Sequence, residues 1–199
     1  MSESKTPADP VRREPLDRLM DGNARFVAAR LENPNRSPER RAQLLEGQKP
    51  FAAILGCADS RVAPEVIFDQ GLGDLFVLRV AGNVATDHMV ASVEYAVAHL
   101  GVPLVMVLGH SRCGAVTATL HKQATEGQLP KLAALIEPAC LLTHCAPGDP
   151  VEQAARTHAR RMAARLREES VIIATAAAEE RIRVVAGYYD LESGRVEVL

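Results

Sequence analysis

The sequence predicts an α/β protein with a mainly parallel central β-sheet flanked by helices. Three short, continuous apolar runs, at 51–56, 75–80 and 104–108, are typical of strands that are buried on both faces. Between the second and third runs, apolar residues recur every three or four positions from 90 to 100, which indicates a helix. Strand, helix and strand in this order favour right-handed crossovers and parallel pairing.

The N-terminal part of the chain is predicted to lie outside this sheet. Residues 1–14 are polar and interrupted by prolines, so we expect a disordered or loosely attached tail there. Residues 15–31 place most of their large apolar side chains on one face, which predicts an amphipathic N-terminal helical arm. Proline, asparagine and serine at 33–38 indicate a loop, and 39–46 is compatible with one short helix.

Helices are predicted to follow the third strand. The first covers 115–123, and 128–145 is expected to be helical with a break near Pro138. A further helix begins at Asp149, an N-cap residue that is followed directly by proline, and continues to 168.

The C-terminal segment is predicted to complete the sheet. Residues 171–180 are apolar and rich in alanine, which favours a helix. Residues 183–189 have the β-branched and aromatic side chains that are typical of a strand. Gly194 separates this strand from 195–198, and the two segments predict a hairpin at the edge of the sheet.

Length and composition indicate a single domain over residues 15–199. The chain has 199 residues, of which 47% are hydrophobic and 24% are charged, enough for one sizeable core. Its net charge of -2 includes no basic excess, so we expect neither a nucleic-acid partner nor a membrane surface. The N-terminus lacks the apolar core of a signal peptide and no run reaches the length of a membrane span, so we predict a cytoplasmic location.

Three residues with metal-binding side chains follow two of the predicted strands. Cys57 comes directly after the first strand, and His110 and Cys113 come after the third. Because ligands collect at the carboxyl ends of parallel strands, this topology can bring the three side chains together. Two thiols and one imidazole form a three-ligand zinc set, and the position left for water is typical of a catalytic zinc. We therefore predict one Zn2+ per chain.

Asp59 and Arg61 stand beside the first of these cysteines. Two roles are open to Asp59: it accepts a hydrogen bond from zinc-bound hydroxide and orients it, or it becomes the fourth zinc ligand and closes the site. Arg61 decides between these states by pairing with the carboxylate in a bidentate fork that holds it away from the metal. We predict that both residues are catalytic.

The remaining cysteines and histidines are expected to have no part in this set. The number and spacing of the cysteines do not indicate a disulfide framework, and we interpret Cys140 and Cys145 as reduced structural thiols in or near a helix. Five histidines are expected at the surface: His88, His99, His121, His144 and His158.

The chain resembles the β-class carbonic anhydrases over most of its length. The resemblance rests on Cys57-Ala58-Asp59-Ser60-Arg61 together with the distant Gly109-His110-Ser111-Arg112-Cys113-Gly114. Residues 121–181 match only loosely. Shorter matches lie at 48–50, 68–76, 79–83, 92–97, 187–190 and 193–194.

The resemblance implies a zinc enzyme that converts carbon dioxide reversibly into bicarbonate and a proton by attack of zinc-bound hydroxide. Two thiolates donate more charge to zinc than imidazoles do, so activity is expected to rise on the alkaline side. Two alternatives stay open. One is hydrolysis of carbonyl sulfide or carbon disulfide on the same scaffold, and the other is a closed-site, non-catalytic zinc protein.

The resemblance also implies a substrate pocket that is shared between subunits. By position, the polar donor of this pocket is Gln48, and its apolar walls are Phe76, Ala81 and Tyr95. Because part of each pocket comes from a second subunit in this family, a homodimer or a dimer of dimers is implied. Some members bind regulatory bicarbonate with a tryptophan at the position where this chain has Ile54, so that form of regulation is not expected here.

Overall fold

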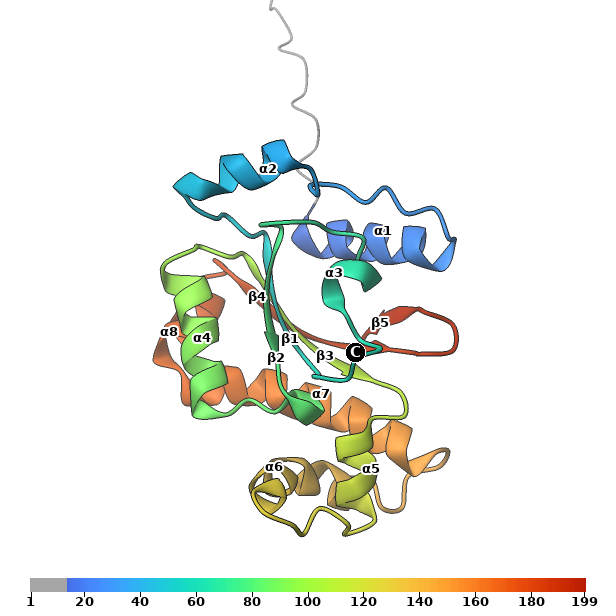
Figure 1. Ribbon diagram of the computed structural model, residues 1–199. Coiled ribbons are helices and arrows are strands. Elements are labelled where there is room, and N and C mark those ends of the chain that lie inside the picture. The colour runs from blue at the N-terminus through green and yellow to red at the C-terminus, as the bar shows by residue number, and fades with distance from the viewer. Residues whose placement is uncertain (1–13) are drawn as a thin grey trace, which may run out of the picture.

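Five strands form one sheet at the centre of the chain, in the order β2-β1-β3-β4-β5 (Figure 1). The computed structural model describes residues 14–199, so residues 1–13 of the predicted tail lie outside the described residues. The first four strands are parallel, and the fifth is antiparallel to β4 at one edge. The predicted fold class and the edge hairpin are therefore confirmed. The strands are β1 (Ala52–Gly56), β2 (Leu75–Arg79), β3 (Leu104–His110), β4 (Arg183–Tyr189) and β5 (Val196–Val198).

Helices cover both faces of the sheet, because successive side chains of a strand point to opposite sides. Ala53 and Leu55 of β1 join a core on one face, and Ala52 and Ile54 join a second core on the other. This burial on both faces explains why the strands appear in the sequence as continuous apolar runs. The first core includes α4 (Asp87–Ala98), α5 (Gly114–Leu120), α6 (Leu129–Leu142), α7 (Pro150–Glu169) and α8 (Val171–Ala178), and the second includes α1 (Pro15–Val27) and α3 (Pro64–Ile67).

α1 packs against its own chain. Leu19 is fully buried in the second core, and the amide of Asn23 joins the helix to two other segments. Nδ2 of Asn23 donates to the carbonyl oxygens of Ile67 (3.2 Å) and Gly194 (2.9 Å), while Oδ1 accepts from the N–H of Val196 (2.8 Å). These contacts hold the predicted helical arm beside α3 and the β4–β5 turn.

Three short helical elements precede β2 in the chain. α2 (Pro38–Gln43) and the 3-10 turn Leu44–Glu46 together occupy the predicted helix at 39–46. α3 has only four residues, which is too short to show helical periodicity, and so the sequence does not predict it.

α1 ends at Val27, earlier than the predicted end at residue 31. The reason is that Ala29 adopts a left-handed conformation (φ 53°) that ends the helix.

α6 continues through Pro138, so the predicted break in this helix is wrong. Proline has no N–H to donate to the carbonyl of Ala134, which weakens the helix locally. Ile136 and Cys140 on either side of Pro138 are both buried, and this packing keeps the helix continuous.

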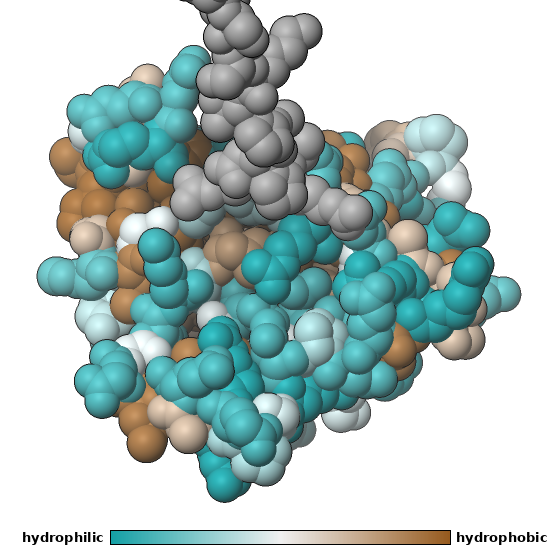
Figure 2. Space-filling view, turned by 90° about the horizontal axis from the view of Figure 1, so that it is seen from above, coloured by the Kyte–Doolittle hydropathy of each residue, from teal (hydrophilic) through white to brown (hydrophobic). Residues whose placement is uncertain are grey.

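The surface carries apolar residues on one side of the fold. Seen from above, the molecule is mostly hydrophilic, and apolar surface gathers toward the side where α4 and α8 lie (Figure 2). Exposed apolar residues include Leu45 after α2, Tyr95 on α4 and Val171 on α8. None of the helices in residues 14–199 combines the length and the apolar character that crossing a membrane requires.

Candidate metal centre

Cys57, His110 and Cys113 meet at the carboxyl edge of the sheet. β1 and β3 pair with Gly56 opposite Leu108, so Cys57, which follows β1, lies beside the end of β3. His110 is the last residue of β3, and Cys113 is the N-cap residue of α5. The three ligand atoms lie within 4.8 Å of one another, and all three residues are buried. Within residues 14–199 no other group of three His, Cys, Asp or Glu side chains converges in this way.

The ring of His110 presents a free nitrogen to this cluster. Its Nδ1 lies 2.8 Å from the carbonyl oxygen of Ser111, which can only accept a hydrogen bond, so Nδ1 carries the ring proton. In this tautomer the lone pair lies on Nε2. This atom is buried and has no hydrogen-bond partner among the described residues. A buried nitrogen without a hydrogen bond lowers the stability of the fold unless a metal ion binds it. The tautomer, with the lone pair on Nε2, is the one that metal ligation requires.

The two cysteines interact directly. A hydrogen bond from the Cys113 thiol is the main cause that lowers the pKa of Cys57. The same hydrogen bond, together with burial, raises the pKa of Cys113. One thiolate therefore forms readily, whereas its charge opposes the formation of a second. A divalent cation removes this opposition, and two sulfurs with one imidazole nitrogen are a ligand set that fits zinc.

Asp59 lies beside the cluster in a bidentate pair with Arg61. Nε of Arg61 donates to Oδ1 at 2.9 Å, and Nη2 donates to Oδ2 at 2.7 Å. These hydrogen bonds are the main reason why the pKa of Asp59 lies well below its usual range. Oδ2 is 4.0 Å from Nε2 of His110. The carboxylate is thus ionised next to the candidate ligands, but the guanidinium holds it.

Arg79 and Gly82 support the Cys57 loop from the end of β2, a role that the sequence does not predict. Arg79 donates from Nε to the carbonyl oxygen of Cys57 (2.9 Å) and from Nη2 to that of Asp59. The N–H of Gly82 donates to the Cys57 sulfur at 3.3 Å. Their position in the sequence could have indicated this role. Both residues stand at or just after the carboxyl end of a predicted strand, and that strand neighbours β1.

The four residues predicted to form the substrate pocket separate into two groups. Ala81 is exposed and lies at the metal centre, because it directly precedes Gly82. Phe76 lies three residues before the last residue of β2, about 10 Å back along the strand. Tyr95 on α4 accompanies Phe76, with 6.2 Å between the ring centroids.

Gln48 lies toward the opposite end of the sheet from the candidate metal ligands. It is exposed and precedes β1, whereas Cys57 follows β1. A strand of this length spans about 16 Å. Within one chain, therefore, Gln48, Phe76 and Tyr95 lie away from the metal centre.

One histidine that was predicted at the surface is fully buried. His158 has no exposed area, so its predicted position is wrong. It lies on the face of α7 that also carries Ala155 and Met162, and this face packs into the first core. Cys140 is buried in α6 and Cys145 is exposed, and both are free thiols. The other four histidines are exposed: His88, His99, His121 and His144.

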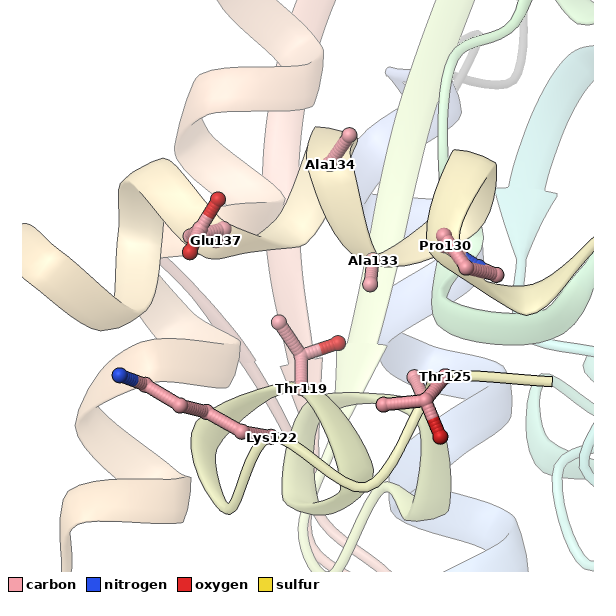
Figure 3. A pocket seen from close by; sticks show the side chains of 8 residues that line it. Thr119, Lys122, Thr125, Pro130, Ala133, Ala134 and Glu137 are labelled. Carbon is pink, nitrogen blue, oxygen red and sulfur yellow. The ribbon is translucent and has the colours of Figure 1, made fainter.

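A separate cavity of about 240 Å³ lies between α5 and α6 (Figure 3). Its walls carry the opposite charges of Lys122 and Glu137, and the hydroxyl of Thr119 already donates to the carbonyl oxygen of Ala115 (2.8 Å). None of its lining residues is cysteine or histidine. This cavity therefore has none of the cysteine or histidine donors that form the cluster at the sheet edge.

Comparison with known proteins relates the chain to carbonic anhydrases. A family model described as carbonic anhydrase matches residues 52–196. A carbonic anhydrase of Mycolicibacterium smegmatis is 44% identical over 185 residues, which cover 90% of this chain and 89% of the relative. Carbonic anhydrase 2 of Mycobacterium tuberculosis is 43% identical over 182 residues, which cover 89% of this chain and 87% of the relative.

Solved structures show the same relationship. The β-carbonic anhydrase CafA of Aspergillus fumigatus is 30% identical with a TM-score of 0.73, and the match covers 81% of each chain. The β-carbonic anhydrase CcaA is 26% identical with a TM-score of 0.72, and the match covers 92% of this chain and 94% of the other. The similarity therefore extends over most of the chain.

The cluster is expected to bind about one zinc ion per chain. Cys57→Ser, His110→Ala and Cys113→Ser each remove one donor. Substitution of a residue that only contacts a metal ligand typically weakens metal binding by roughly 10–100-fold. Each of these three substitutions should weaken zinc binding by more than that. Cys140→Ser, which removes a buried thiol outside the cluster, is the control and should bind zinc as the wild type does. Competition with a chelator measures the affinities, and full zinc content in all three ligand variants would contradict the assignment.

Proposed function

Because the chain belongs to the β-class carbonic anhydrase family, we propose that it catalyses the reversible hydration of carbon dioxide to bicarbonate and a proton. The observation that carries this proposal is the convergence of Cys57, His110 and Cys113 beside the Asp59–Arg61 pair. These three residues would hold one zinc ion per chain. Zinc supplies Lewis acidity, which makes water a nucleophile near neutral pH.

In this proposal Asp59 orients the attacking water. Oδ1 accepts hydrogen bonds from the backbone N–H and from Nε of Arg61, whereas Oδ2 accepts a single one from the described part of the chain, from Nη2 of Arg61. Oδ2 therefore keeps a lone pair near Nε2 of His110, where it can accept a hydrogen bond from water at the ligand cluster. Since the pKa of Asp59 is held well below its usual range, the carboxylate stays ionised and acts only as an acceptor.

Arg61 keeps the carboxylate of Asp59 from becoming a fourth ligand. Its guanidinium donates one hydrogen bond to each carboxylate oxygen. Nη2 also donates to the carbonyl oxygen of Arg112, at 3.4 Å. Arg112 directly precedes Cys113, so the guanidinium spans from one side of the cluster to the other. This restraint supports a catalytic site over a closed, non-catalytic zinc protein.

We further propose that the active unit is a homodimer whose two chains share each substrate pocket. Gln48, Phe76 and Tyr95 lie away from the metal centre of their own chain, whereas Ala81 lies beside it. β2 is an edge strand, and Tyr95 nearby has 48% of its surface exposed. A second copy seated on this edge would cover apolar surface and bring its own polar and aromatic pocket residues to the first centre.

The proposed location is the cytoplasm. All four cysteines are free, and two of them belong to the candidate metal centre. Reducing compartments maintain cysteines in this state, which supports the proposal.

Carbon dioxide hydration, followed by stopped flow across pH, tests the proposed reaction. The zinc-loaded chain should hydrate carbon dioxide with a rate that rises toward alkaline pH. Activity should disappear when a chelator removes the metal and return when zinc is restored. Carbonyl sulfide and carbon disulfide are offered to the same sample. If the chain hydrolysed either of them but did not hydrate carbon dioxide, the proposed substrate would be wrong.

Arg61→Ala tests the restraint on Asp59. The variant should retain its zinc but lose activity by at least about tenfold, because the freed carboxylate is attracted to the cation and takes the place of water. Arg181→Ala is the matched control, since Arg181 also pairs with a carboxylate two residues earlier, Glu179, at the surface. It should be as active as the wild type. The idea fails if a crystal structure of zinc-loaded Arg61→Ala keeps Asp59 remote and activity is normal.

Mixing two inactive variants tests the shared pocket. Cys57→Ser disables the metal site of its own chain, and Gln48→Ala removes the donor that each chain is proposed to supply to its partner. A mixed dimer then contains one complete site. Refolding equal amounts together should therefore restore about a quarter of the wild-type activity, if the chains assort at random. Activity no higher than the average of the two variants alone would show that each pocket lies within one chain.

A further inference from the structure

The loop that follows β2 reaches the metal centre through two left-handed residues. Gly82 and Asn83 have φ of 70° and 43°, a conformation that glycine and asparagine adopt more readily than other residues. Gly82 is also closely packed, because a Cβ there would lie 2.7 Å from Cδ1 of Ile136 and 3.2 Å from Cβ of Ala115. Since the N–H of Gly82 donates to the Cys57 sulfur, the position of this loop sets one of the hydrogen bonds to a candidate ligand.

One face of α7 holds this loop through three side chains. Nε2 of His158 lies 2.8 Å from the carbonyl oxygen of Gly82. Sδ of Met162 accepts from the N–H of Ala85 (3.3 Å), and Nε of Arg165 donates to the Ala85 carbonyl oxygen (3.0 Å). The three residues are four and three positions apart, so they lie along one face of the helix.

His158 is the member of this set nearest to the candidate ligand. The carbonyl oxygen of Gly82 can only accept, so Nε2 of His158 must carry the ring proton. Nδ1 is then without a proton, and it is buried with no partner among the described residues. Burial lowers the pKa of His158 to about 4, so the ring stays neutral. A buried histidine with one unsatisfied nitrogen is less favourable for stability than an apolar residue of similar size. Its presence in the core therefore indicates a role for its single hydrogen bond.

α7 is itself held close to the strand that carries His110. A Cβ on Gly109 would lie 3.2 Å from the carbonyl oxygen of Ala155 and from Cβ of Ala159. Gly109 precedes His110, and Ala155 and Ala159 lie on either side of His158 along the helix. The same stretch of α7 therefore contacts the backbone next to one candidate ligand and supports the loop that contacts another.

We propose that His158 is a positioning residue for the metal centre: by holding Gly82, it fixes the N–H that donates to the Cys57 sulfur. It does not touch the metal or the substrate. This inference rests on the proposed function, because it assumes that Cys57 binds zinc. The hydrogen bond to the sulfur restrains its orientation and disperses thiolate charge, so its loss should weaken and loosen the metal site.

Two substitutions separate the hydrogen bond from simple packing. His158→Leu fills similar space but has no donor, and should weaken zinc binding by about 10–100-fold in chelator competition. His158→Gln keeps an N–H group near the position of Nε2, and should stay within about threefold of the wild type. Leu166→Val, which trims another buried residue of α7, is the control and should leave zinc affinity unchanged. In the cobalt-substituted proteins, the thiolate-to-metal absorption bands should shift only in His158→Leu.

Several outcomes would overturn the inference. It is wrong if folded His158→Leu binds zinc like the wild type, or if His158→Gln is as weak as His158→Leu. If His158→Leu does not fold, nitrogen NMR of the wild type decides, because the ring must be neutral with its proton on Nε2, and the other tautomer contradicts the proposal. If the wild type bound no zinc at all, the proposed function would fail first, and this inference with it.

Discussion

The parallel pairing of β1 with β3 is the constraint on which the metal centre depends. With Gly56 opposite Leu108, the residues that follow the two strands reach the same edge of the sheet, and Cys57 meets His110 there. Side chains alternate along a strand, so a slip of one residue would turn one of the two ligands to the other face. Both strands are buried on both faces. The position of β3 is further constrained at Gly109, where a Cβ would lie 3.2 Å from Ala155 and Ala159 of α7. The apolar core, which includes Cys57 and Cys113, thus determines the geometry of the site.

Burial then gives this site its chemical character. Nε2 of His110 has no hydrogen-bond partner within residues 14–199, and Cys57 and Cys113 oppose each other's ionisation. The unpartnered nitrogen costs stability in the metal-free chain, and the opposition between the two thiols limits the negative charge that the cluster can hold. A divalent cation relieves both constraints at once. Metal binding and folding are therefore expected to be coupled. Around the cluster, Arg61 holds the carboxylate of Asp59, and His158 of α7 hydrogen-bonds to the loop at Gly82. The supporting contacts therefore come from elements far apart in the sequence.

The sheet and the cluster were predictable from the sequence because their signals are local and strong. Continuous apolar runs predict the strands, and Cys57 and His110 stand where two of those runs end. The predicted break at Pro138 failed because tertiary packing overrides a local rule. The burial of His158 could have been predicted, because helical periodicity places this residue on the same face of α7 as Ala155.

Other parts of the site could not be predicted from the sequence. No pattern of residues tells which carbonyl oxygen a buried histidine meets, because that depends on how helix and loop pack. Similarly, the resemblance named Gln48, Phe76, Ala81 and Tyr95 together, but only the arrangement of the strands separates Ala81 from the other three. Positions that depend on contacts between distant elements, or between two chains, have no local signature.

We infer that two cysteines and one histidine from separate elements bind a single zinc ion. X-ray absorption at the zinc edge of the purified wild-type chain tests it most directly, because sulfur is distinguished from nitrogen and oxygen by distance and scattering. The spectrum should require two sulfurs at about 2.3 Å and a histidine nitrogen at about 2.0–2.1 Å, with lighter atoms completing the shell. A shell of nitrogen and oxygen alone, or one of four sulfurs, would contradict the account.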